Sequence, residues 1–356
     1  MIEGSRELLN YPTVHRATLY EKLPDDTVRC GLCERKCIIQ NGKMGFCRTR
    51  ININGELYTL VYGNLSALES RPIEIKPFFH YWPGSTALTF STWSCNFECQ
   101  WCQNYHLSRR TPNPFRDSFI SQEEVLSQAL IRGDRGLCAS FQEPTLLTDW
   151  ILNLFREGSR RGLYCCYVSN GYMTLQALRL LKDSGMDAIK IDMKGDAEVY
   201  QRYCGGIDVE KVWRNIHEAK RMGLHVEVVN LIVTGVNDDE SCLECIIERH
   251  LKEAGAETPI HFTRYYPAYK FSNPPTKIEI LERAYEMAKK AGVEYPYIGN
   301  VPGHRYENTY CPNCGELLIK RFGYTIIKCK LTAEKRCPKC KHKIPIVGEV
   351  NKRIIG

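Results

Sequence analysis

Residues 86–102 read TALTFSTWSCNFECQWC, and they decide the fold that we expect. Residues 86–93 are rich in β-branched and aromatic side chains, which predicts a buried strand. Cys95, Cys99 and Cys102 follow directly, with three and then two residues between them. A strand that ends in a loop of thiolates presents metal ligands on a rigid scaffold.

The same strand begins a long alternation of apolar β-prone runs and segments of helical period. This alternation predicts parallel βα units, which form either an open doubly wound sheet or a partly or fully closed barrel. In each case ligands bind at the carboxyl ends of the strands. The further strands are expected within 137–142, 164–170, 187–193, 225–233 and 259–266, and the helices within 121–132, 146–160, 175–185, 209–223, 242–255 and 277–292.

The three cysteines of the first loop suggest an iron-sulfur site with an open position. Three thiolates can hold three corners of a 4Fe-4S cluster and leave the fourth iron without a protein ligand. That iron can chelate the amino and carboxylate groups of a methionine, and an electron from the cluster can then break an adjacent sulfonium bond. The alternative is a zinc site, for which His106 would supply the fourth ligand.

The spacing CxxxCxxC, with an aromatic residue before the last cysteine, resembles the signature of the radical S-adenosylmethionine (SAM) superfamily. Within it, the chain is most similar to the AmmeMemoRadiSam system radical enzymes, which are related to pyruvate formate-lyase activating enzymes. The resemblance extends over roughly residues 28 to 348 and implies a partial (β/α)6 barrel. It rests on the order of the motifs CGLCERKC (30–37), SFQEPTLL (140–147), SNGY (169–172), IDMKGD (191–196), YIGNVPGH (297–304) and NTYCPNCG (308–315).

The resemblance also implies roles for individual residues. Cys95, Cys99 and Cys102 would be the catalytic cluster ligands, and Glu143 would hold the ammonium group of SAM. Phe141 and Gln142 stand where the superfamily has two glycines, so the backbone contacts of that motif are in question. The residues expected to bind the cofactor are Trp101, Gln142, Glu143, Ser169, Asn170, Asp192 and Lys194.

Two further cysteine groups indicate additional metals. The N-terminal group supplies four thiols in one compact segment, which suits either zinc or an auxiliary iron-sulfur cluster, and free thiols are the simpler alternative. The C-terminal pairs CPNC and CPKC predict a zinc ribbon, for which a rubredoxin-like iron is the alternative. The two groups are Cys30, Cys33, Cys37 and Cys47, and Cys311, Cys314, Cys337 and Cys340.

Composition and charge predict a cytoplasmic protein. Eighteen cysteines in a chain of 356 residues that shows no signal peptide point to metal ligands and not to disulfides, and no apolar run is long enough for a membrane span. Residues 304–356 hold twelve Lys or Arg against four Glu, so this end is basic. We expect a Cys-rich segment at 1–80, a radical SAM core at 81–300 and a basic zinc-ribbon module at 301–356.

The expected activity is reductive cleavage of SAM to a 5′-deoxyadenosyl radical, which abstracts hydrogen from a macromolecular substrate. A glycyl or peptide position of a protein is favoured over RNA, which the basic C-terminus could bind. Such an oxygen-sensitive enzyme needs a low-potential electron donor such as ferredoxin or flavodoxin. The alternative from another class is a noncatalytic electron-transfer or zinc-binding protein.

Overall fold

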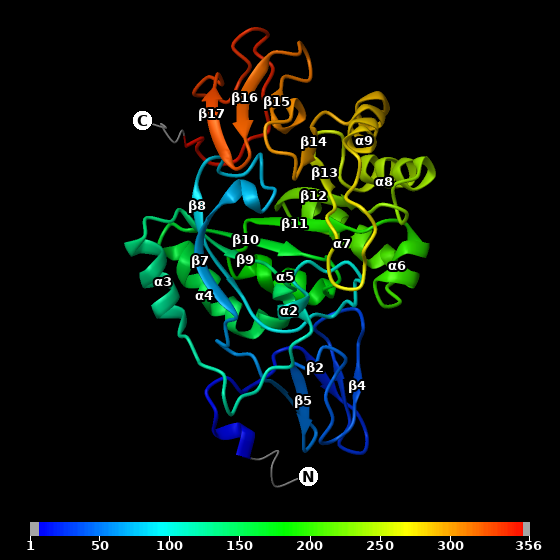
Figure 1. Ribbon diagram of the computed structural model, residues 1–356. Helices are drawn as coiled ribbons and strands as arrows, with labels where there is room; N and C mark the ends of the chain where they lie inside the picture. The colour runs from blue at the N-terminus through cyan, green and yellow to red at the C-terminus, as the bar shows by residue number, and fades with distance from the viewer. Residues whose placement is uncertain (1–6, 352–356) are drawn as a thin grey trace. The chain divides into compact units, whose positions relative to one another are not determined.

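The computed structural model describes residues 7–351 of the chain (Figure 1). The chain divides into two compact units. Unit 1 comprises residues 1–70 and 87–187, and unit 2 comprises residues 71–86 and 188–356. Within the described residues, every helix is too short or too polar to span a membrane.

Unit 1 begins with two small antiparallel sheets, whose strand orders are β1-β6-β5 and β2-β3-β4. The strands are short because turns and cysteines interrupt the chain every few residues. Buried Leu57, Val28 and Ile51 are among the apolar side chains of this part. The elements are η1 (Leu8–Asn10), β1 (His15–Arg16), β2 (Tyr20–Lys22), β3 (Val28–Cys30), β4 (Ile38–Ile39), β5 (Arg50–Ile53) and β6 (Glu56–Thr59). Strand β7 (Ala67–Pro72) follows them and pairs with β8 (Thr86–Ser91) at the edge of the larger sheet.

The larger part of unit 1 is a parallel sheet. Strand β9 pairs in parallel with β8 on one side and with β10 on the other. Helix α4 contacts β9 and β10, and it also packs against α3 and α5. The elements are β8 (Thr86–Ser91), α2 (Tyr105–Ser108), α3 (Gln122–Ile131), β9 (Gly136–Ala139), η3 (Pro144–Leu147), α4 (Thr148–Arg160), β10 (Tyr164–Ser169) and α5 (Leu175–Asp183).

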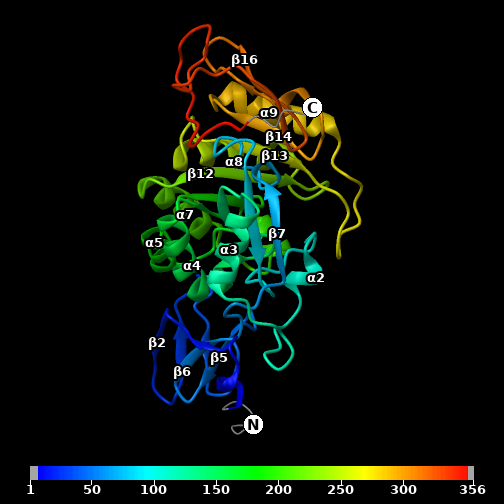
Figure 2. The same ribbon diagram turned by 90° about the vertical axis from the view of Figure 1, so that its left-hand side faces the viewer.

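Unit 2 continues the same pattern with four parallel strands in the order β11-β12-β13-β14. Helix α7 contacts β11 and β12, and α9 contacts β13 and β14 (Figure 2). The elements are η2 (Ile73–Ile75), β11 (Ala188–Met193), α6 (Ala197–Tyr203), α7 (Val209–Arg221), β12 (His225–Ile232), α8 (Glu240–Glu253), β13 (Ile260–Arg264), α9 (Ile278–Ala291) and β14 (Pro296–Gly299).

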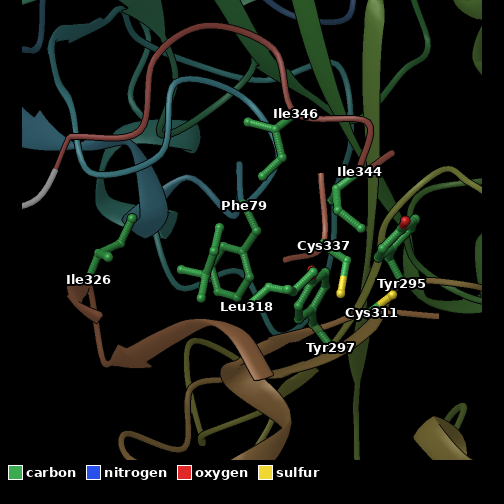
Figure 3. Packing of buried hydrophobic residues seen from close by; sticks show 10 residues of the cluster. Phe79, Tyr295, Tyr297, Cys311, Leu318, Ile326, Cys337, Ile344 and Ile346 are labelled. Carbon is green, nitrogen blue, oxygen red and sulfur yellow. The ribbon is translucent and has the colours of Figure 1, made fainter. Parts of the chain in front are cut away.

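The C-terminal part of unit 2 is a small antiparallel sheet with the order β15-β16-β17. It shares a buried core with β14 and with residue 79 of the same unit, as Figure 3 shows for Phe79, Tyr297 and Leu318. Arg321 is buried there and donates to the carbonyl of Phe79 over 2.9 Å. The elements are η4 (Arg305–Glu307), β15 (Thr309–Tyr310), β16 (Leu317–Phe322) and β17 (Thr325–Cys329).

The expected α/β class with a parallel sheet is confirmed, and the parallel strands do not close into a barrel. Each expected strand and helix of the alternating region has a counterpart, but β14, α2 and α6 were not anticipated. Strand β14 is only four residues long and starts with a proline, so its sequence carries almost no periodic signal. The module boundaries expected near residues 80 and 300 stay a prediction.

Candidate functional site

The three central cysteines lie on an irregular loop between β8 and α2. All three are half-buried. Ser94, which precedes them, has a left-handed backbone with φ 70°. This conformation is unfavourable for a residue with a Cβ, and neighbouring contacts must hold it in place. The Ser94 hydroxyl donates to the carbonyl of Cys47 over 2.6 Å, and its amide donates to the carbonyl of Leu107 over 2.9 Å. The loop is therefore held from both sides.

Burial raises the pKa of the Cys95 thiol well above its usual range. The carboxyl group of Glu143 adds to this increase, and the thiols of Cys99 and Cys102 contribute as well, whereas the amide of Phe97 opposes it. That amide donates to the sulfur of Cys95 over 3.4 Å. Within residues 7–351, the sulfurs of these three cysteines do not form a group in which all lie within 4.8 Å of one another, so their role as cluster ligands stays a prediction.

Glu143 lies four residues beyond β9 and directly before η3, and it is fully buried. Its Oε1 accepts from the amide and the hydroxyl of Thr145 and from the hydroxyl of Ser169, at 3.1, 2.5 and 2.9 Å. Its Oε2 accepts from the amide of Asn170 over 2.8 Å. Burial raises the pKa of Glu143, and these hydrogen bonds oppose the rise. The carboxyl group thus joins the loop between β9 and η3 to the end of β10.

Asn170 connects this carboxylate to the cysteine loop. Its Nδ2 donates to Oδ1 of Asn96 over 2.7 Å and lies 3.9 Å from the sulfur of Cys95. Asn96 follows Cys95 directly, so residues 74 positions apart in the chain meet at one place. The structure therefore brings Cys95, Glu143, Ser169 and Asn170 into one network within unit 1.

The motif in which two glycines are replaced keeps a glycine-like backbone. Phe141 has φ 74°, a region that residues with a Cβ rarely occupy. Its carbonyl accepts a hydrogen bond from Nδ2 of Asn104, which comes just after the cysteine loop. Gln142 donates from its side chain to the carbonyl of Glu143 over 3.1 Å. The backbone carbonyl of Phe141 thus makes a contact that could not be predicted from the Phe and Gln side chains of this motif.

The other expected site residues are placed as follows. Trp101 is buried, with 3% of its surface exposed, and its expected packing on adenine stays a prediction. His106 is exposed on α2, and within residues 7–351 it is not gathered with the three cysteines into a close metal-binding group.

Asp192 and Lys194 belong to unit 2 and end β11. The carboxylate of Asp192 pairs with the ammonium groups of Lys190 and, over 3.2 Å, of Lys194. Burial alone would raise the pKa of Asp192, but the two lysines lower it to about 2. Asp192 and its two lysine partners thus form a cluster of charged groups at the end of β11. The expected contact of Asp192 and Lys194 with SAM stays a prediction.

The comparisons with known proteins agree with the cysteine loop. Residues 91–250 match the model of the Radical SAM superfamily. Residues 91–250 therefore form a domain of the Radical SAM superfamily. The chain is 41% identical over 338 residues to the uncharacterized protein MJ0808 of Methanocaldococcus jannaschii, covering 94% of this chain and 100% of that protein.

Other relatives match smaller parts of the chain. A probable GTP 3′,8-cyclase of Sulfolobus acidocaldarius is 29% identical over 41% of this chain and 46% of its own length. Among solved structures, a domain of a pyruvate-formate lyase-activating enzyme from Bacteroides vulgatus is 17% identical with a TM-score of 0.41, covering 46% of this chain and 99% of that domain. SuiB of Streptococcus suis bound to SAM has a TM-score of 0.47 at 11% identity, over 59% of this chain and 50% of that chain.

This radical SAM domain indicates an enzyme, and the superfamily implies a 4Fe-4S cluster and SAM. The donor set fits both groups. Cys95, Cys99 and Cys102 are three soft ligands on one loop without a fourth beside them in the sequence motif. Beside them, Glu143 offers a buried carboxyl group and Ser169 and Asn170 offer hydroxyl and amide groups, which suit the ammonium, carboxylate and ribose of SAM.

The C-terminal cysteines form a separate metal-binding group. The ligand atoms of Cys311, Cys314, Cys337 and Cys340 all lie within 4.8 Å of one another. The sulfurs of Cys311 and Cys340 are 3.4 Å apart, and those of Cys314 and Cys337 are 3.6 Å apart. Figure 3 shows Cys311 and Cys337 side by side near Tyr297. Such a tetrahedral set of thiols suits zinc, which stays a prediction.

Two residues of unit 1 escaped the analysis of the sequence. Asn96 carries the link between Cys95 and Asn170, and Arg50 forms a buried ion pair with Asp149 over 2.5 Å. Asn96 lies between Cys95 and Cys99, at a position where the motif allows any residue. Its place beside Cys95 was therefore the only hint that the sequence offered. Arg50 gave no signal, because its partner is remote in the sequence.

Proposed function

We propose that the protein reductively cleaves SAM at a 4Fe-4S cluster on Cys95, Cys99 and Cys102. The observation that carries this proposal is the network joining Cys95 to Asn170, Ser169 and Glu143. When bound, the cluster and SAM supply one electron and a sulfonium bond, whose cleavage yields methionine and a 5′-deoxyadenosyl radical that takes a hydrogen atom from the substrate.

The residues of the chain position the cofactor in this proposal. Four hydrogen bonds hold the carboxyl group of Glu143 in place, three on Oε1 and one on Oε2, and in this proposal Oε2 would pair with the ammonium group of SAM. Asn170 ties the same carboxylate to the cysteine loop and sets their separation. Because Glu143 and Ser169 are buried, water has little access to the place where the radical would form.

We propose a macromolecular substrate, and a protein or peptide position is the first class. The support is the resemblance of the motifs to activating enzymes. RNA is the second candidate, and the hairpin of β16 and β17 favours it. This hairpin exposes Phe322 and Tyr324, with 62% and 48% of their surfaces accessible, between the exposed lysines Lys320 and Lys328. Aromatic rings among cations are typical of surfaces that bind single-stranded nucleic acid.

The proposed cleavage is tested by measuring 5′-deoxyadenosine. The chain is purified without oxygen, loaded with iron and sulfide, and mixed with SAM and dithionite. We expect 5′-deoxyadenosine from the intact chain and from the control Cys245→Ala, because Cys245 is exposed on α8. A variant that combines Cys95→Ala, Cys99→Ala and Cys102→Ala should form none, because it lacks all three ligands of the cluster.

The outcome that contradicts the proposal is a loaded cluster in the intact chain that yields no 5′-deoxyadenosine. That result would place the protein in the electron-transfer or metal-binding class. Adding peptide or RNA fractions to the active chain then separates the substrate classes, since the true substrate accelerates nucleoside formation.

A further inference from the structure

The four N-terminal cysteines surround a cavity in unit 1. The cavity is small, and Cys30, Cys33, Cys37 and Cys47 line it together. Three of them are buried and Cys37 is half-buried. We propose that this cavity binds a second iron-sulfur cluster, held by all four thiolates. The proposal concerns a site separate from the radical SAM cysteines and does not depend on SAM cleavage.

A buried cation at the cavity supports a negatively charged occupant. Arg50 lines the cavity and is only 1% exposed. Its guanidinium pairs with Asp149 and donates to the carbonyl of Leu146 over 3.2 Å, but its Nε has no hydrogen-bond partner in the structure. A buried N–H without an acceptor costs about 1–3 kcal/mol. A sulfide or thiolate in the cavity would be an acceptor for it.

The remaining wall of the cavity also suits a cluster. Arg35 lies 3.5 Å over the ring of Phe46, and its Nε donates to the carbonyl of Asn96 over 2.6 Å. Leu32, Ile39 and Leu146 supply apolar surface. Two cations and an apolar lining match the needs of an iron-sulfur cluster, whose potential depends on nearby charge, hydrogen bonds and solvent.

The spacing of the thiols favours a cluster over a single zinc ion. Within residues 7–351, the four C-terminal cysteines have their sulfur atoms within 4.8 Å of one another, and the four N-terminal cysteines do not form such a group. The N-terminal thiols instead face a cavity. A single zinc ion binds sulfur at about 2.3 Å and therefore draws its four thiolates into contact. A cubane of four irons and four sulfides sits between its ligands and keeps them farther apart.

The cavity adjoins the central cysteine loop through one side chain. Asn96 lines the cavity, follows Cys95 in the sequence and accepts a hydrogen bond from Asn170 over 2.7 Å. A side-chain hydrogen bond from Asn96 also acts on the thiol of Cys33, opposing the rise in pKa that burial causes. The proposed second cluster would therefore share a wall with the radical SAM site.

The test counts metals in the full chain after anaerobic loading with iron and sulfide. The decisive variant combines Cys95→Ala, Cys99→Ala and Cys102→Ala and leaves the N-terminal cavity untouched. We expect it to keep about four irons and four sulfides per chain, half of the roughly eight in the intact chain. Combining Cys33→Ala and Cys47→Ala in the intact background should likewise leave about four, whereas the control Cys245→Ala should leave about eight.

The spectrum of the central triple variant provides a second readout. Its cluster has protein ligands on all four irons, so added SAM should leave its electron paramagnetic resonance spectrum unchanged. Circular dichroism verifies that each variant is folded. A folded triple variant without iron would overturn the proposal. So would a second zinc atom per chain that Cys33→Ala and Cys47→Ala remove. These metal counts do not depend on SAM cleavage. If the intact chain failed to cleave SAM, the expected iron and sulfide contents of each variant would be unchanged.

Discussion

At the scale of single residues, cysteine spacing carried most of the predictive information. The proposal of Cys95, Cys99 and Cys102 as cluster ligands rests on their spacing in one short loop and stays a prediction. The carboxylate network could not be predicted in the same way. Ser169 and Asn170 reach Glu143 from the next strand, so their hydrogen bonds depend on how β9 and β10 pair.

The backbone of Phe141 leads to a stability prediction. Phe141→Gly and Phe141→Ala remove the same ring, but only glycine adopts φ 74° without a Cβ clash. The glycine variant should therefore have the higher free energy of unfolding, by about 1–2 kcal/mol. Urea titrations of the two metal-loaded variants measure the difference. An alanine variant as stable as the glycine variant would show that this backbone carries no strain.

At the scale of elements, the alternating pattern located the strands because their apolar runs are continuous. Strand β10, for example, has four buried residues in succession at its start, as expected of a parallel strand covered on both faces. Strand β14 and helix α6 were missed, because they are too short to show a period. The grouping of the four C-terminal cysteines was predicted from their spacing, but the core that the small sheet shares with Phe79 and Tyr297 was not, since those contacts join distant parts of the chain.

The ribbon permits a matched test of its metal. Cys337 belongs to the group of four thiols, whereas Cys329 ends β17 outside that group. We expect Cys337→Ser to lose about one zinc per chain and to lower the melting temperature, because a tetrahedral site needs its fourth ligand. Cys329→Ser should keep its zinc. Metal analysis by mass spectrometry and thermal melting check this, and equal zinc in both variants would argue against the ribbon site.

At the scale of the whole molecule, buried histidines connect stability to pH. His250 of α8 is fully buried and bonds to the carbonyl of Thr258 over 2.9 Å. Burial lowers the pKa of His250 from 6.5 to about 4. Below pH 6.5 the unfolded chain therefore binds a proton that the folded chain does not, and stability falls as the pH drops towards 4.

Replacing this histidine should flatten the pH dependence. His250→Gln keeps a donor for Thr258 but cannot titrate. Between pH 7.5 and 5.5 its free energy of unfolding should fall less than that of the parent chain, by about 1 kcal/mol. The exposed His217 gives the control His217→Gln, which should behave like the parent chain. Urea titrations at the two pH values measure the effect, and parallel loss in all three chains would refute it.

The walls of the N-terminal cavity also set an order of assembly during synthesis. Its cysteines occupy residues 30–47, but Asn96 and Leu146 complete the enclosure. A ribosome must therefore release about a hundred residues beyond the last of these cysteines before the cavity can close. Until then the thiols are open to solvent and to oxidants in the cell. A factor that delivered iron before the cavity closed would meet its ligands on a nascent chain that does not yet include Cys311 to Cys340.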